Sequence, residues 1–282
     1  MISRFIFLML VVSSFSSHAG TYAQFRTFWG DIGVELYDDD KPITVRNFLR
    51  YVQSGRYSNM FFHRCPTNQF SGITDFVVQG GGFFASTNGI ERVETFGEIP
   101  NEFGVGRPFS NTYGTIAMAK VSGDTNSASS GFFFNLNDNS FLDAANADGF
   151  FTVFGRVVGR STNVLNFYRG LSIDRGIKDL GGELSTLPVT YLGPREPTFN
   201  DLEYVDISVL KLSVAATNGV RELSWNSLGT NHVYHVEFST NLPPVWQTLT
   251  STNGIGRNGE TMRITDSSAG PTRRFYRVRI GL

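Results

Sequence analysis

The sequence predicts a mainly β protein, with a closed antiparallel β-barrel capped by two helices and a small C-terminal β-sandwich. The first observation is composition: 26 Phe and 30 Gly in 282 residues favour strands and tight turns over long helices. The second is a series of short runs in which apolar and polar residues alternate, as in half-buried strands. The third is that two segments carry the apolar spacing of a helix. Closing the sheet into a barrel would remove its exposed edges.

The barrel elements begin with alternating residues over 22–37, which predict a strand or hairpin. A helix is expected to begin at Pro42 and to end at Gly55. Its apolar face, at positions i, i+3, i+4 and i+7, is formed by Val45, Phe48, Leu49 and Val52.

Further short strands and a second helix complete the predicted barrel. We expect the helix over 162–169, ended by Gly170. The glycines at 80–82 lack the spacing of a phosphate loop, so we interpret them as close backbone packing between strands. The remaining strands are expected over 60–64, 76–79, 116–118, 132–135, 152–158 and 205–212.

Residues 1–19 have the pattern of a signal peptide. Arg4 precedes an apolar run over 5–12, and small residues lead to a cleavage site after Ala19. The run is too short to span a bilayer comfortably, although a retained lipid-facing anchor is the alternative. We therefore expect an exported protein, periplasmic or extracellular, with no membrane span after removal of the signal. The barrel domain is then 20–212.

The tail, 213–282, has no helical pattern and is predicted to be the separate β-sandwich. Turn dipeptides at 218–219, 253–254 and 258–259 separate five or so short alternating runs. The tail has more basic than acidic residues. A solvated strand face explains this excess; contact with a polyanion is the alternative.

Charge and residue counts exclude several function classes. The net charge of −1 does not favour a nucleic-acid partner, since phosphates call for a strongly basic face. The single cysteine, Cys65, permits no internal disulfide, and we interpret it as a free buried thiol in preference to a redox group. His232 and His235 would point to opposite faces of a strand, which makes a poor metal pair. We expect no metal and no cofactor.

Four segments carry a resemblance to a known family: FFHRCP, DFVVQGGGF, YGTIAMAKVSGDTNSASSGFFFNLNDNSFLD and FTVFGRVVGR. Together, and in this order over most of 21–212, they resemble the cyclophilins, β-barrel peptidyl-prolyl cis-trans isomerases. The tail is similar, on weaker grounds, to the fibronectin-type-III-like modules of secreted bacterial proteins.

The resemblance places a catalytic arginine at Arg64. It also implies a set of substrate-binding residues: Phe76, Val77, Gln79, Met118, Ala119, Lys120, Phe133, Phe141, Leu142 and Phe151. Three departures from the family pattern stand out. The loop over 65–75 is longer, a family glutamine is Gly131, and Val77 replaces a long flexible side chain. These departures predict slower turnover or altered peptide choice.

The chemistry expected of such a site needs no nucleophile. Rotation about a peptide bond has a barrier of about 18–20 kcal/mol, and in the twisted state the proline nitrogen gains a lone pair. A guanidinium aimed at that nitrogen stabilises the twisted state more than either planar isomer. The resemblance, taken together with the signal-peptide pattern of residues 1–19, therefore implies an exported isomerase that acts on proline-containing peptides and unfolded exported proteins. The alternative is a catalytically weak or inactive peptide-binding module, tethered to a surface or partner by its C-terminal domain.

Overall fold

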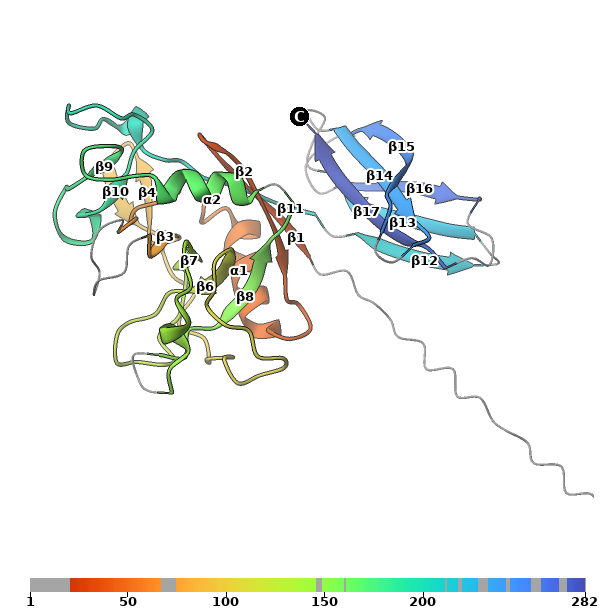
Figure 1. Ribbon diagram of the computed structural model, residues 1–282, viewed down its shortest axis with the longest axis horizontal. Helices are drawn as coiled ribbons and strands as arrows, with labels where there is room; N and C mark the ends of the chain where they lie inside the picture. Colours follow the sequence, from red (N-terminus) through yellow and green to blue (C-terminus); the bar gives the residue numbers. More distant parts are fainter. Residues whose placement is uncertain are drawn as a thin grey trace, which may run out of the picture.

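The computed structural model describes residues 21–66, 75–145, 149–159, 161–210, 212–217, 220–227, 233–241, 244–254, 260–268 and 273–281 (Figure 1). The signal-peptide prediction, 1–19, and most of the long loop after Arg64 lie outside these residues. No helix in the described chain is long and apolar enough to cross a membrane.

A seven-stranded antiparallel sheet forms the N-terminal part, in the order β11-β1-β2-β8-β6-β7-β3. It is a curled half-barrel (Figure 1). Its strands are β1 Tyr22–Thr27, β2 Gly30–Leu36, β3 Val77–Gly80, β6 Thr115–Met118, β7 Phe132–Asn135, β8 Val153–Val157 and β11 Asp206–Leu210. Each of these seven strands falls within or beside a range that the alternating pattern predicted.

The segment 60–64 lies between the two end strands of this sheet. Its Phe61 pairs with Tyr204, just before β11, and its Arg64 pairs with Gln79 in β3. The backbone hydrogen bond from Phe62 N to Glu203 O is 2.9 Å long. The predicted strand over 60–64 is thus a run of isolated bridges. The structure therefore shows a curled sheet with this segment between its two end strands. Isolated bridges do not make the continuous strand pairing that the predicted closed barrel requires.

Two helices cover this sheet, as predicted. Helix α1, Pro42–Ser54, ends at Gly55, whose φ of 75° is the left-handed conformation that glycine adopts without strain. Helix α2, Thr162–Arg169, ends at Gly170. Phe48 of α1 packs edge-on against Phe132 of β7, with ring centroids 5.7 Å apart. Aromatic packing between helix and sheet therefore forms the core.

Two short hairpin-like pairs and three 3₁₀ turns were not anticipated from the sequence. Their apolar residues do not alternate, or their strands are only two residues long, so neither period is visible. They are β4 Phe83–Ser86 with β5 Gly89–Arg92, β9 Ile177–Lys178 with β10 Leu187–Pro188, η1 Ser140–Asp143, η2 Gly182–Leu184 and η3 Phe199–Asp201.

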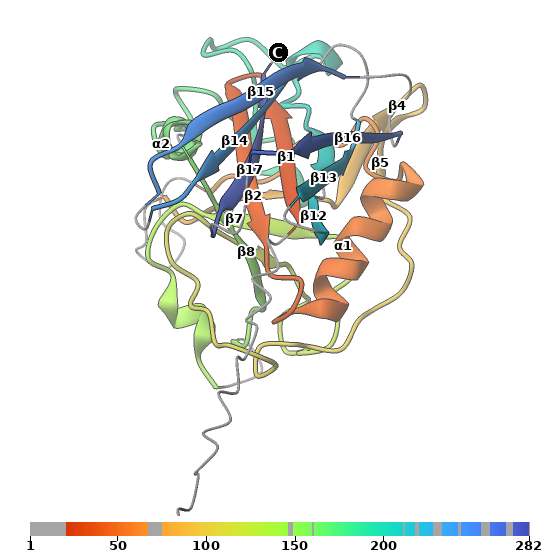
Figure 2. The same cartoon turned by 90° about the vertical axis from the view of Figure 1, so that its right-hand side faces the viewer.

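The C-terminal part contains two three-stranded sheets, β12-β13-β16 and β15-β14-β17. One hydrophobic cluster joins Leu223 and Trp225 of the first sheet to Tyr234 and Val236 of the second. The strands lie beside β11 and β1, at the far end of the main sheet from β3 (Figures 1 and 2). Their bounds are β12 Ser213–Thr217, β13 Val220–Asn226, β14 Val233–Ser239, β15 Gln247–Asn253, β16 Thr261–Asp266 and β17 Phe275–Gly281.

Candidate functional site

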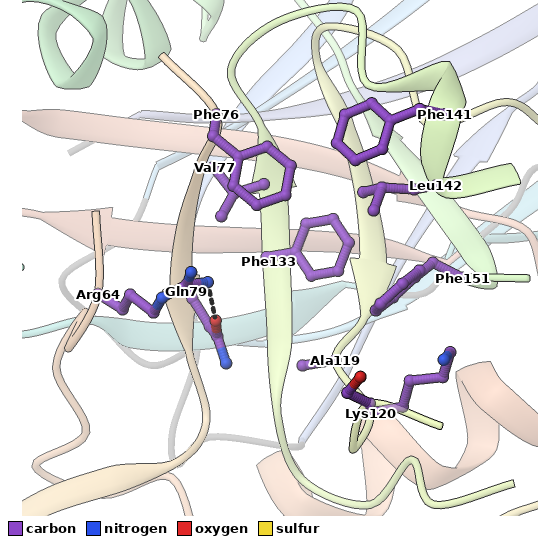
Figure 3. Close-up of a pocket in the computed structure, with 11 residues that line it drawn as sticks. Arg64, Phe76, Val77, Gln79, Ala119, Lys120, Phe133, Phe141, Leu142 and Phe151 are labelled. Atoms are coloured by element: carbon purple, nitrogen blue, oxygen red, sulfur yellow. Dashed lines mark hydrogen bonds between the residues drawn. The ribbon is translucent and has the colours of Figure 1, made fainter. Parts of the chain in front are cut away.

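A cavity of about 550 Å³ opens beside β3 and β7 (Figure 3). That volume is in the range of sites that bind small molecules or short peptide segments. Ten of the eleven predicted site residues line it. The lining consists of Arg64, Phe76, Val77, Gln79, Ala119, Lys120, Ser122, Phe133, Phe141, Leu142 and Phe151. Segments far apart in sequence thus bring the predicted residues together around one cavity. Ser122 also lines the cavity, although the sequence did not indicate it.

Arg64 and Gln79 stand together at one side of the cavity. The backbone N of Gln79 donates to Arg64 O at 2.8 Å, which sets the two residues side by side. The Arg64 Nη1 then donates to the Gln79 Oε1 at 3.2 Å (Figure 3). Burial lowers the pKa of Arg64 from its ordinary value, although a guanidinium stays charged at any physiological pH. The cation is therefore oriented before any ligand arrives.

Aromatic and aliphatic side chains form the rest of the cavity wall. Phe76 stacks on Phe141 with ring centroids 5.7 Å apart, and Phe133 meets Phe151 edge-on at the same distance. Leu142, which is 7% exposed, packs in the same cluster. Because these groups cannot hydrogen-bond water, they favour an apolar guest such as a pyrrolidine ring.

Lys120 lies at the other side of the cavity from Arg64 (Figure 3). Its Nζ is 4.5 Å from the centre of the Phe151 ring, a cation–π distance. Among the described residues, the charged groups that line the cavity are Arg64 and Lys120, and both are cationic. The cavity is therefore an apolar hollow flanked by two positive charges.

Met118 is the one predicted site residue that does not line the cavity. Side chains alternate across strand β6, so Ala117 packs with the cavity cluster while Met118 packs in the main core. Met118 is only 3% exposed. Ala119, two residues after Ala117, lies on the same face and lines the cavity, and Lys120, which follows the end of the strand, lines it as well.

Gly131 is next to the cavity wall, as the departure from the family pattern implies. Its backbone O accepts a hydrogen bond from Ala119 N at 2.9 Å. A Cβ built on Gly131 would lie 3.1 Å from the Ala119 Cβ, which is closer than ordinary van der Waals contact. A larger residue at 131 therefore requires Ala119 to shift by a few tenths of an ångström.

A buried asparagine network behind the cavity was not predicted. Asn139 Nδ2 donates to Phe76 O at 2.7 Å and to Asn135 Oδ1 at 2.8 Å. Asn111 Nδ2 donates to Phe151 O at 3.0 Å, and Asn135 Nδ2 donates to Asn111 Oδ1 at 3.1 Å. The network thus fixes the backbone of two aromatic wall residues. Its signal in the sequence is the polar Asn135 that ends an otherwise apolar run.

Cys65 and the described histidines, the other residues that could carry chemistry, lie outside the cavity lining. Cys65 is a free buried thiol, as expected, and burial raises its pKa well above the ordinary value. Burial, and then the charges of Arg64 and Arg92, lower the pKa of His63 to about 3. His63 Nδ1 has no hydrogen-bond partner among the described residues. His232 lies outside the described residues, which contain no cluster suited to a metal ion.

Comparison with known proteins agrees with this geometry. A sequence model of the family described as "Cyclophilin type peptidyl-prolyl cis-trans isomerase/CLD" matches residues 22–179. The chain belongs to the cyclophilin family. The match includes every residue that lines the cavity and ends before the C-terminal strands.

Several bacterial cyclophilins are similar to this chain. A peptidyl-prolyl cis-trans isomerase of Acinetobacter baylyi is 41% identical over 145 residues, which are 51% of this chain and 70% of the relative. The cyp18 isomerase of Streptomyces antibioticus is 37% identical over 162 residues, 56% of this chain and 89% of the relative. A solved cyclophilin-type isomerase of Cryptosporidium parvum, crystallised in the presence of the dipeptide Ala-Pro, has a TM-score of 0.43 at 22% identity. The structural match covers 67% of this chain and 98% of the Cryptosporidium parvum chain.

Proposed function

We propose that this cyclophilin accelerates cis–trans rotation about Xaa-Pro bonds and assists the folding of exported proteins. The observation that carries the proposal is the Arg64 guanidinium, held by Gln79 at the edge of an apolar cavity. Cyclophilin relatives at 37–41% identity that bear the isomerase name support the same activity.

In this proposal the proline ring enters the hollow that Phe133 and Phe151 line. Arg64 then donates an N–H to the proline nitrogen as the bond twists and its lone pair appears. This hydrogen bond is stronger in the twisted state than in either planar isomer, so it lowers the barrier. The apolar wall excludes water and strengthens the contact. Each ~1.4 kcal/mol of such stabilisation gives a tenfold gain in rate.

The test is the substitution Arg64→Ala in the full chain. We expect kcat/KM for an Xaa-Pro peptide to fall tenfold or more, because the donor to the twisted bond is lost. The measurement is a protease-coupled or NMR exchange assay. Arg46→Ala, an exposed residue of α1 outside the cavity lining, is the matched control and should leave the rate unchanged. An unchanged rate in a folded Arg64→Ala protein would exclude the role.

A second candidate function is a peptide-binding module with weak or no turnover. Gly131 and Val77 favour it, because each removes side-chain atoms that the family pattern places at the site. NMR line-shape analysis of a proline peptide separates the two functions. Binding without faster exchange between the cis and trans signals would support the module; faster exchange would support the enzyme.

Export rests on the pattern of residues 1–19, with its basic start, apolar run and small residues before Ala19. N-terminal sequencing of protein recovered outside the cytoplasm should begin at residue 20. Recovery of the full-length chain only in the cytoplasmic fraction would contradict export.

For the C-terminal strands we propose a fibronectin-type-III-like module that tethers the enzyme. Two three-stranded sheets around one apolar cluster support the likeness. Sedimentation of the full chain with a cell-wall fraction tests the tether, and full recovery in the supernatant would contradict it.

A further inference from the structure

The sign of the charge at the cavity differs from that of the protein as a whole. The full chain has a net charge of −1, yet Arg64 and Lys120 give the described cavity lining two positive charges. A hollow with apolar walls concentrates the field of such charges, since little water screens them. Such a field favours a ligand that carries negative charge.

Two carboxylates that directly adjoin cavity-lining residues in sequence are bonded to residues that do not line the cavity. Asp75, which precedes Phe76, pairs with Arg169 at 3.6 Å. Asp143, which follows Leu142, accepts hydrogen bonds from Ser110 and from Asn111 Nδ2. Both carboxylates are thus engaged with partners on other segments, and neither is part of the described cavity lining.

Lys120 lies beside the part of the cavity that the proposed function assigns to the proline ring. Its Nζ lies 4.5 Å from the centre of Phe151, which forms the socket together with Phe133. An extended peptide advances about 3.3 Å per residue, so side chains one or two positions from a seated proline can reach the ammonium. An ammonium has three N–H donors, so it can bind a substrate carboxylate alongside contacts within the protein.

We propose that Lys120 is a specificity-determining residue, which favours Xaa-Pro substrates carrying Asp or Glu one or two residues from the proline. The proposal rests on the proposed function, because it seats the proline in the cavity that Phe133 and Phe151 line. Arg64 acts on the proline nitrogen, whereas Lys120 acts on the flanking side chain. The two cations therefore have separate roles at opposite sides of one cavity (Figure 3).

The experiment uses the full chain and a set of peptides with one proline. Glu, Gln or Lys is placed in turn at each of the two positions before and the two positions after the proline. Isomerisation is measured as kcat/KM and binding as Kd by NMR titration, for wild type and for Lys120→Met. Methionine has a side chain of similar length without the charge. Arg46→Gln, which removes one positive charge outside the cavity lining, is the matched control.

At one or more positions we expect wild type to prefer Glu over Lys by about three- to tenfold, with Gln between them. Lys120→Met should abolish this order and Arg46→Gln should retain it. In 0.5 M salt the preference should shrink. Equal constants for the Glu and Lys peptides at all four positions would overturn the proposal, as would an order that persists in Lys120→Met.

Failure of the proposed function would be recognised separately. If the Gln peptides are not isomerised at all, the enzymatic proposal fails. The Kd values then still test Lys120, since a charge preference in binding that depends on Lys120 supports selection by the cavity. Equal Kd values for the Glu and Lys peptides would reject it.

Discussion

One side-chain amide, that of Asn139, joins two parts of the cavity wall. It donates to the backbone of Phe76 and to Asn135, and its own residue begins the turn that carries Phe141 and Leu142. Asn139 is fully buried, and its loss removes the shorter of two hydrogen bonds to the Phe76 carbonyl, which keeps only the bond from Leu136 N at 3.1 Å.

We therefore predict that Asn139→Ala weakens peptide binding while preserving the chemical step. The expected effect is a several-fold rise in KM with a smaller change in kcat, because Phe76 and Phe141 are less well fixed while Arg64 stays on Gln79. Stability should fall by about 1–3 kcal/mol. Steady-state kinetics and denaturant unfolding measure both effects. Ser140→Ala, at the exposed neighbouring position, is the control, and a variant with unchanged KM would contradict the positioning role.

Among the elements, the turn after β3 depends on a glycine for two reasons. Gly81 has a φ of 79°, and a Cβ added to it would lie 2.3 Å from Ser130 O. Gly123 has the same φ of 79°, with nothing within 4 Å of an added Cβ. Comparing substitutions at Gly81 and Gly123 therefore distinguishes the cost of an unfavourable backbone angle, which both share, from the cost of a steric clash, which only Gly81 has.

We predict that Gly81→Ala destabilises the protein much more than Gly123→Ala does. The Gly123 variant should lose about 1 kcal/mol, the strain of a positive φ. The Gly81 variant should lose at least about 2 kcal/mol more, because the Cβ meets backbone that cannot rotate away. Urea unfolding of both variants measures the difference, and equal losses would show that the close approach carries no cost.

Helix α1 and the residues around the cavity show which parts of the structure the sequence could predict and which it could not. Helix α1 was predictable from Pro42, Gly55 and its apolar face, because these signals are local. The cavity was predictable through the family resemblance, residue by residue. The resemblance could not show that Met118 packs in the main core, because it gives position along the chain but not the face of the strand. The buried amide of Asn139 was missed because its bond to the Phe76 carbonyl joins residues that are far apart in sequence, and no periodic pattern marks it.

At the scale of the whole molecule, Glu203 lies where β11, α2 and the β1–β2 turn meet. Its Oε1 accepts hydrogen bonds from Phe28 N and from the Tyr168 hydroxyl, both at 3.0 Å. Its Oε2 has no partner among the described residues, and the side chain is fully buried. Burial is the main cause that raises the pKa of Glu203 to about 7.

This carboxyl makes the stability of the whole fold depend on pH. Between its unfolded pKa of about 4.5 and its folded pKa of about 7, the folded state holds a proton that the unfolded state has released. The contribution to stability is therefore fully present below about pH 4.5 and is lost as the pH rises to 7. Its size is up to about 3 kcal/mol. His63 has the opposite sign, because its pKa is lowered and its contribution is lost on acidification.

Because the two groups oppose each other, the prediction concerns the difference between wild type and Glu203→Gln. Glutamine keeps an acceptor for Phe28 N and Tyr168 but cannot ionise. The unfolding free energy of wild type relative to the variant should therefore fall as the pH rises from 4.5 to 7 and stay constant above about 8. Urea unfolding at four pH values measures it, and the His63 contribution cancels in the difference. A difference that is constant across this range would mean that Glu203 titrates alike in the folded and unfolded chain. The junction of β11, α2 and the β1–β2 turn would then admit water that the structure excludes.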